Sequence, residues 1–378
     1  MNTYGDIRAK FEMAMNENSD FGKAIKRLVD LEDQVQSMDP AHAQTIASEI
    51  NTAADYIERF GPISEIKSYF VDTKGFSDKD FKRIESILKK ESSVDITAIR
   101  NYIKSPKSVE YFTNINSTKE IVPKISTDTA MSKKFIKELF SMDGSMKSGK
   151  GVGRGELFLG FMIDGATNAS VGDVNANGKP FEVKGISARL NTQNGFGNGR
   201  AAISKFFEVF SKLDKDLAKK YQPETKDDFA SFNYKKGGSS RFYDLLQDAY
   251  KAGLDLKKIY KIQSETMYCS ASGIWSNGDA KIKKMIIDNL SNNINKDGSP
   301  KNDEALNYEF MYINILYYQT QEFFNGIFLI EPNKGLFAYF DPSMSKNAAV
   351  KWLTKYTKYT QPSWQDNPTS NCWKITIR

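Results

Sequence analysis

Apolar residues recur at helical spacing through much of the first third of the chain. The series from Ile46 to Phe60 predicts one helix, and a second helix is predicted to begin at the N-cap residue Ser77. Shorter helical patterns continue to the end of this stretch. Residues 1–124 are therefore predicted to form a mainly helical N-terminal region, and nothing in its pattern suggests a reaction.

From residue 125 onward, strand and helix patterns alternate. A helix is predicted from Glu156 to about Met162, followed by two short strands joined by a tight turn. Helical periodicity returns over residues 201–325, and the aromatic residues of its last segment are expected in a buried core. The segments GIFLIEP and GLFAYFD then predict a hairpin that extends the sheet, and CWKITIR predicts a final strand.

Together these patterns predict an α/β fold in which a mixed sheet is flanked by helices. The core is placed at residues 125–350, with the helical stretch around 201–325 inserted into it or appended to it. Residues 351–378 are predicted to be a C-terminal extension that ends in a strand. A chain of 378 residues is longer than one small core requires, which agrees with more than one domain.

The composition excludes several classes of protein. His42 is the single histidine, and no acidic or cysteine partner stands at ligand spacing, which excludes histidine-based metal sites and hydrolases. Cys269 and Cys372 are too few for a disulfide framework and fit a reducing compartment. Neither a long apolar run nor a signal-peptide pattern is found, so we expect a cytoplasmic protein without a membrane partner.

Charge is distributed unevenly along the chain. Residues 1–60 hold 6 basic and 11 acidic residues, a net charge of −5, so the remaining residues carry +11 within a total of +6. A basic body fits a polyanionic ligand such as nucleic acid. A lysine-rich surface without such a ligand would have the same composition, so charge alone does not decide between the two.

A loop rich in glycine, serine and lysine lies at residues 144–151. It is one residue short of a phosphate-binding P-loop, because Gly151 follows Lys150 where that motif requires serine or threonine. The preceding segment FIKELF is typical of a helix, whereas a P-loop follows a buried strand. A flexible basic loop that leads into the core is therefore favoured over nucleotide binding.

The segment between Asp173 and Lys184 carries the candidate chemistry. Asn177-Gly178 is a strong signal for a two-residue hairpin turn, and this turn would place Asp173 directly opposite Glu182. Lys184 lies two residues beyond Glu182 and therefore points to the same face of the sheet. The opposite, core-facing side would be formed by Val174, Phe181 and Val183.

Two facing carboxylates repel each other by a few tenths to about 1 kcal/mol, so removing one is expected to stabilise the apoprotein slightly. A bound divalent cation makes the paired carboxylates favourable instead, because Mg²⁺ prefers carboxylate oxygens and completes its coordination shell with water and substrate phosphate. The adjacent Lys184 could orient or deprotonate the attacking water, or neutralise charge on the phosphate. Glu156, on the preceding helix, could supply a further carboxylate.

Asp173, Glu182 and Lys184 match a D…E-x-K motif, and this part of the chain resembles the PD-(D/E)xK nucleases, which share the restriction-endonuclease-like fold. Glu156 matches the acidic residue often found on the first core helix of that family. The resemblance covers only the segment around the motif. The pattern GRGE…GD…EVKG is also similar to that of phage-encoded nucleases.

The resemblance implies a DNA endonuclease that hydrolyses phosphodiester bonds with a metal-activated water. The implied cofactor is Mg²⁺, for which Mn²⁺ would substitute, and the implied metal ligands are Asp173, Glu182, the Val183 carbonyl and Glu156. The implied catalytic residues are Glu156, Asp173, Glu182 and Lys184.

Side chains that flank the motif are candidates for contacts to the DNA backbone. They carry positive or amide groups in glycine-rich segments, and they are Lys147, Lys150, Arg154, Arg189, Gln193 and Arg200. For the three that follow the motif, a mobile polar surface loop is an equally good interpretation.

Two other function classes stay open. One is a non-catalytic DNA-binding or virion-associated protein with a nuclease-like fold, against which the intact set of acids and Lys184 argues. The other is nucleotide binding by the loop at residues 144–151. The sequence also leaves open the DNA specificity, nicking or double-strand cleavage, and formation of a homodimer. A phage-encoded protein would act in the host cytoplasm.

Overall fold

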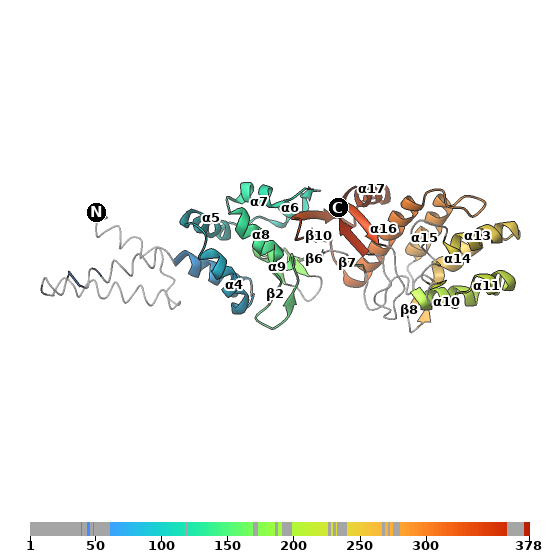
Figure 1. Cartoon of the computed structure of the whole chain (residues 1–378), viewed down its shortest axis with the longest axis horizontal. Coiled ribbons are helices and arrows are strands. Elements are labelled where there is room, and N and C mark those ends of the chain that lie inside the picture. Colours follow the sequence, from blue (N-terminus) through green and yellow to red (C-terminus); the bar gives the residue numbers. More distant parts are fainter. Residues whose placement is uncertain are drawn as a thin grey trace. The chain divides into compact units, whose positions relative to one another are not determined.

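The computed structural model is a mixed α/β protein of helices and small sheets, in agreement with the predicted α/β class (Figure 1). It describes residues 39, 44–45, 48, 61–117, 119–168, 173–185, 188–190, 199–225, 228–229, 232, 240–266, 269–270, 273–274, 280–360 and 374–378. Of the helix predicted between Ile46 and Phe60, only Ser48 is among these residues, and it is helical; the rest lies outside them. No helix in the described ranges is long and apolar enough to cross a membrane.

The chain folds into two compact units, each described here by itself. The first unit comprises Met1–Lys107 and Val122–Asp164, and the second comprises Ser108–Ile121 and Gly165–Arg378. This division differs from the predicted boundary at residue 124 and falls inside the predicted core. One cause is long-range strand pairing, since β1 (Asn116–Ser117) pairs with β11 (Leu336–Phe340) and so joins the second unit.

The predicted C-terminal extension is instead built into the second unit. α17 (Lys346–Tyr356) runs across the predicted boundary at residue 350. The predicted final strand is present as β13 (Lys374–Ile377), which pairs with both β12 (Thr357–Thr360) and β7 (Ala188–Arg189). Ile375 is fully buried in the main apolar cluster of this unit.

Helices dominate the first unit. Within the described ranges its elements include the π-helical turn η1 (Tyr69–Thr73), α4 (Asp78–Leu88), α5 (Ser93–Lys104), α7 (Val122–Thr129), α8 (Lys133–Ser141), β2 (Gly144–Ser145), β3 (Gly151–Val152) and α9 (Glu156–Met162). Ser77, Ser92 and Ser132 cap α4, α5 and α8, since each side chain accepts a backbone N–H three residues further on. The predicted helix start at Ser77 is confirmed.

α9 has the bounds that the sequence predicted, and its residues after Glu156 are buried. Its last carbonyls are satisfied by side chains from other elements. The Tyr69 and Tyr102 hydroxyls and the Lys74 ammonium donate to the carbonyls of Phe161, Met162 and Ile163, in that order, at 2.9, 2.5 and 2.7 Å. Burial lowers the pKa of Lys74 to about 8. These contacts hold α9 in place and fix the position of Glu156 within the first unit.

A six-stranded mixed sheet organises the second unit. Its strands lie in the order β1, β11, β10 (Ile327–Glu331), β6 (Lys179–Lys184), β5 (Val174–Ala176) and β4 (Thr167–Asn168). β6 and β10 run parallel, with Glu182 beside Ile327 and Lys184 beside Leu329. The other neighbouring strands are antiparallel, including the predicted β10–β11 hairpin.

The β5–β6 hairpin has the predicted register. Val174 pairs with Phe181, Asn175 with Pro180, and Ala176 with Lys179. Asn177 and Gly178 form the turn with φ angles of 54° and 74°, the left-handed conformation that asparagine and glycine adopt most readily. The local sequence thus fixes which side chains of β6 share a face.

Different elements bury the two faces of this sheet. On one face Phe181, Phe328 and Tyr339 contact one another, with ring centroids 5.1 to 6.2 Å apart. On the other face, Ile327 and Leu329 belong to the apolar cluster that the helices build. The other elements that the structure describes in this unit are α6 (Val109–Thr113), α10 (Gly199–Phe210), α11 (Lys215–Tyr221), α13 (Arg241–Lys251), α14 (Leu256–Thr266), β8 (Cys269–Ser270), β9 (Gly273–Ile274), α15 (Ala280–Asn293) and α16 (Asp303–Glu322).

Candidate functional site

Glu182 and Lys184 lie side by side on the helix-covered face of β6. Glu182 is only 5% exposed, and the Lys184 ammonium forms an ion pair with its Oε1 atom. Tyr318 of α16 donates its hydroxyl to the same Oε1 at 2.6 Å. The Lys184 ammonium also lies 5.2 Å from the centre of the Tyr318 ring. The E-x-K pair is therefore part of a buried, charged cluster.

Asp173 lies one residue before β5 and turns its side chain onto the backbone of β6. Its Oδ2 accepts the Val183 N–H at 2.8 Å, and its own N–H donates to the Phe181 carbonyl at 2.9 Å. The strand ladder ends at Val174 and Phe181, one pair short of Asp173 and Glu182. The predicted pairing of the two acids across the ladder is therefore replaced by a contact between Asp173 and the peptide that follows Glu182.

The backbone of Val183 faces the same edge of β6 as Asp173. Successive residues of a strand direct their N–H and C=O groups to opposite neighbours. The Glu182 N–H donates to the Gly326 carbonyl on the β10 side at 2.9 Å, so the Val183 N–H and C=O point to the β5 side. The predicted contribution of the Val183 carbonyl to a metal site is thus compatible with the course of the strand.

Glu156 is held in the other unit, at the first turn of α9. Its carboxylate lies against Gly153, where any Cβ atom would collide with it, and its N–H donates to the Gly153 carbonyl at 3.2 Å. The three other predicted catalytic residues belong to the second unit. A shared role for Glu156 with those residues stays a prediction.

The donor set of the second unit fits a hard, oxygen-preferring cation. Within the described ranges, no group of three or more histidine, cysteine, aspartate and glutamate side chains is poised to hold a metal. Mg²⁺ needs fewer protein side chains than this, because it commonly binds one or two carboxylates and fills the rest of its coordination shell with water and phosphate. Lys184 and Tyr318 both act on Oε1 of Glu182, and among the described residues no donor is found on Oε2. That oxygen, the Asp173 carboxylate and the Val183 carbonyl are the candidate ligands.

The candidate DNA-contacting residues divide between the units. Lys147 lies in the turn between β2 and β3, where its ammonium is 2.9 Å from Asp72, and Lys150 and Arg154 are exposed nearby in the sequence. Arg189 stands in β7 and Arg200 in α10, and their side chains, like all of Gln193, lie outside the described residues. The three described side chains, Lys147, Lys150 and Arg154, belong to the first unit, and their contact with DNA stays a prediction.

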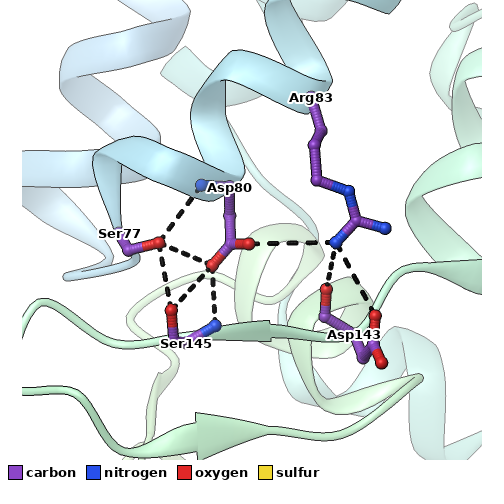
Figure 2. Close-up of polar contacts among 5 residues, drawn as sticks. All are labelled: Ser77, Asp80, Arg83, Asp143 and Ser145. Atoms are coloured by element: carbon purple, nitrogen blue, oxygen red, sulfur yellow. Dashed lines mark hydrogen bonds and ion pairs between the residues drawn. The ribbon is translucent and has the colours of Figure 1, made fainter.

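The glycine- and lysine-rich segment forms a tethered hairpin rather than a P-loop or a flexible loop. β2 and β3 pair with each other, and the element before them is the helix α8, so the buried strand that a P-loop requires is missing. Figure 2 shows how α4 holds the hairpin. Asp80 accepts the Ser145 N–H at 2.7 Å and the Ser77 hydroxyl at 2.6 Å, and its side chain is 6% exposed.

This tether gives the first testable prediction. Asp80→Ala removes the acceptor of the Ser145 N–H, and a buried unpaired donor costs about 1–3 kcal/mol. Amide hydrogen exchange in peptides that cover residues 143–152 should therefore accelerate about 5–150-fold. Asp143→Ala is the matched control, because Asp143 is 64% exposed and Arg83 also bonds its backbone carbonyl at 2.9 Å. Equal exchange in both variants would show that Asp80 does not hold the hairpin.

Tyr318 is the residue of the cluster that sequence reasoning missed. The helix that carries it was correctly expected in the core, and Tyr318 is 5% exposed. Its hydroxyl, however, reaches a carboxylate 136 positions away in the sequence. Nothing in the helical pattern distinguishes this tyrosine from Tyr308, Tyr312 or Tyr317 on the same helix.

Comparison with known proteins finds no match, since neither a protein-family model nor a characterised protein nor a solved structure is similar to this chain. The site must therefore be interpreted from its own residues. The second unit brings together the buried Glu182, its ion-pair partner Lys184, and Tyr318, which donates to Glu182. Asp173 accepts the N–H of Val183, the residue between Glu182 and Lys184.

Proposed function

We propose that this protein is a Mg²⁺-dependent DNA endonuclease. The observation that carries the proposal is the grouping of Asp173, Glu182 and Lys184 around the Val183 peptide at the edge of β6. Two acids and a strand carbonyl can hold Mg²⁺, which activates water for phosphodiester hydrolysis, and a lysine can stabilise charge on the phosphate. The match of these residues to the D…E-x-K motif supports the same proposal.

In this proposal the acids hold the cation and the lysine acts on the reacting groups. Asp173, Glu182 and the Val183 carbonyl, all in the second unit, would be the ligands. Bound Mg²⁺ would activate water and offset negative charge on the phosphate. Lys184, kept beside Glu182, would orient that water or stabilise charge that develops on the phosphate oxygens.

The restriction-endonuclease-like core is part of the same proposal. It is supported by the position of β6, which lies between an antiparallel hairpin partner and the parallel strand β10. The helix α9 with Glu156 precedes these strands in the chain, as the motif match expects. DNA as the partner is supported by the charge of the chain beyond residue 60, which is +11 within a total of +6.

The direct test is cleavage of supercoiled plasmid DNA by the purified full chain. We expect nicked or linear DNA with Mg²⁺ or Mn²⁺ and intact plasmid with EDTA. Ca²⁺ should allow DNA binding with little cleavage, because it fills an oxygen site but activates water poorly. Binding should weaken as salt increases, since lysine and arginine displace counterions from phosphate. Intact plasmid under every metal condition would contradict the proposal.

A non-catalytic DNA-binding protein is the second candidate. It is favoured by the closed contact of Glu182 with Lys184 and Tyr318, because a buried ion pair with a hydrogen-bonding neighbour can persist without any metal. The same assay separates the two functions. DNA binding that is unaffected by EDTA, without cleavage in Mg²⁺, would support the binding protein.

A further inference from the structure

We propose that Tyr318 is a positioning residue that selects which oxygen of Glu182 is presented to the metal. This inference rests on the proposed function, because it assigns a role within the same site. It adds a residue that the D…E-x-K motif does not contain and that lies on α16, far from the motif in the sequence.

Both hydrogen-bond donors at Glu182 contact the same carboxylate oxygen, Oε1. Tyr318 and Lys184 both donate to Oε1. At 2.6 Å the tyrosine contact has the length of a hydrogen bond to an ionised acceptor, which is stronger than a neutral one. Among the described residues no donor reaches Oε2. With Oε1 held, the carboxylate cannot rotate without breaking two contacts, so Oε2 keeps a fixed direction.

The Tyr318 ring acts on the second catalytic group. The Lys184 ammonium lies 5.2 Å from the ring centre, within the range in which a cation is attracted to an aromatic face. The same side chain therefore contacts both members of the E-x-K pair. The hydroxyl fixes the glutamate and the ring restrains the lysine, and these two effects can be separated by substitution.

Tyr318 is itself held firmly enough to position other groups. One turn earlier on α16, the Asn314 amide donates to the Leu190 carbonyl at 2.8 Å. One residue later, the Gln319 amide donates to the Phe324 carbonyl at 2.9 Å, and the Phe324 ring packs 5.2 Å from the Tyr318 ring. Both sides of Tyr318 on the helix are thus bonded to segments outside α16. Groups that orient a metal ligand act best from such rigid elements.

Tyr318→Phe removes the hydroxyl and keeps the ring. Loss of a group that orients a metal ligand typically weakens metal affinity or activity about 10–100-fold. We expect the dissociation constant for Mn²⁺, titrated alone into the full chain by calorimetry, to rise by about this factor. Cleavage at limiting Mn²⁺ should fall in parallel and recover at saturating Mn²⁺. Tyr318→Leu, which also removes the ring beside Lys184, should not recover fully.

The matched control is Tyr308→Phe on the same helix. Tyr308 is 2% exposed, and its hydroxyl donates to the Thr357 carbonyl at 2.8 Å and accepts from the Arg378 guanidinium at 3.0 Å, so this variant also loses the hydrogen bonding of a buried tyrosine hydroxyl. It should lose stability without a change in Mn²⁺ affinity. If Tyr318→Phe binds Mn²⁺ as tightly as the wild type does, this inference is wrong and the proposed function stands. A wild-type chain that neither binds Mn²⁺ nor cleaves DNA would overturn both.

Discussion

Glu182→Gln is expected to abolish Mg²⁺-dependent cleavage of DNA while the chain stays folded. The amide keeps an oxygen that can accept from Tyr318 and Lys184, but it removes the negative charge that would hold the cation. A catalytic metal supplies several kcal/mol of transition-state stabilisation, and each 1.36 kcal/mol is a factor of ten in rate. The single-turnover rate should therefore fall by at least about 10³-fold. Asp173→Asn should have an effect of the same order.

Glu331→Gln provides the matched control for this loss. Glu331 is also 5% exposed and lies on the neighbouring strand β10, but its carboxylate accepts the Asn333 N–H within the β10–β11 turn. This variant should cleave DNA at close to the wild-type rate. Wild-type cleavage by Glu182→Gln in Mg²⁺ would mean that the metal site is assigned to the wrong residues.

The structure reverses one expectation about the stability of the apoprotein. Two carboxylates that face each other should repel, so truncation of either acid was expected to be slightly stabilising. Glu182 instead neutralises the Lys184 ammonium, whose side chain is 17% exposed. Glu182→Ala would leave that charge largely buried and without its partner, which destabilises a fold. For this reason glutamine, rather than alanine, is the informative substitution at position 182.

Local signals account for the parts of the geometry that were predicted correctly, namely the β5–β6 register and the bounds of α9. Asn177-Gly178 specifies a turn with both residues in the left-handed region, and this turn fixes the β5–β6 register. Strand alternation then places Glu182 and Lys184 on one face, as expected. The bounds of α9 also follow from the apolar run that begins after Glu156.

The parts that sequence analysis missed depend on contacts between distant segments. The ladder stops before Asp173 because its carboxylate bonds the Val183 N–H, and a side chain that replaces a strand pair leaves no periodic signal. The parallel pairing of β6 with β10, and with it the position of α16, joins segments separated by well over 100 residues. The assignment of Ser108–Ile121 to the second unit has the same origin, because β1 in this segment pairs with the distant strand β11.

Lys184→Ala is expected to keep metal and DNA binding and to lose about 10²–10³-fold in cleavage rate, the usual effect of removing a preorganised charge-stabilising group. The ammonium does not bind the cation and would mildly repel it. Its removal leaves the Glu182 carboxylate without its ion-pair partner but with the hydrogen bond from Tyr318, so some loss of apoprotein stability is expected and thermal unfolding of the variant should be measured beside the cleavage rate. Lys184→Arg separates two mechanisms, because arginine keeps the charge but scarcely loses a proton. Partial activity would indicate charge stabilisation, and almost none would indicate a general base.

Lys179→Ala is the control, since Lys179 lies on the same strand with an exposed side chain. Normal cleavage by Lys184→Ala would make the E-x-K match a coincidence of a structural ion pair.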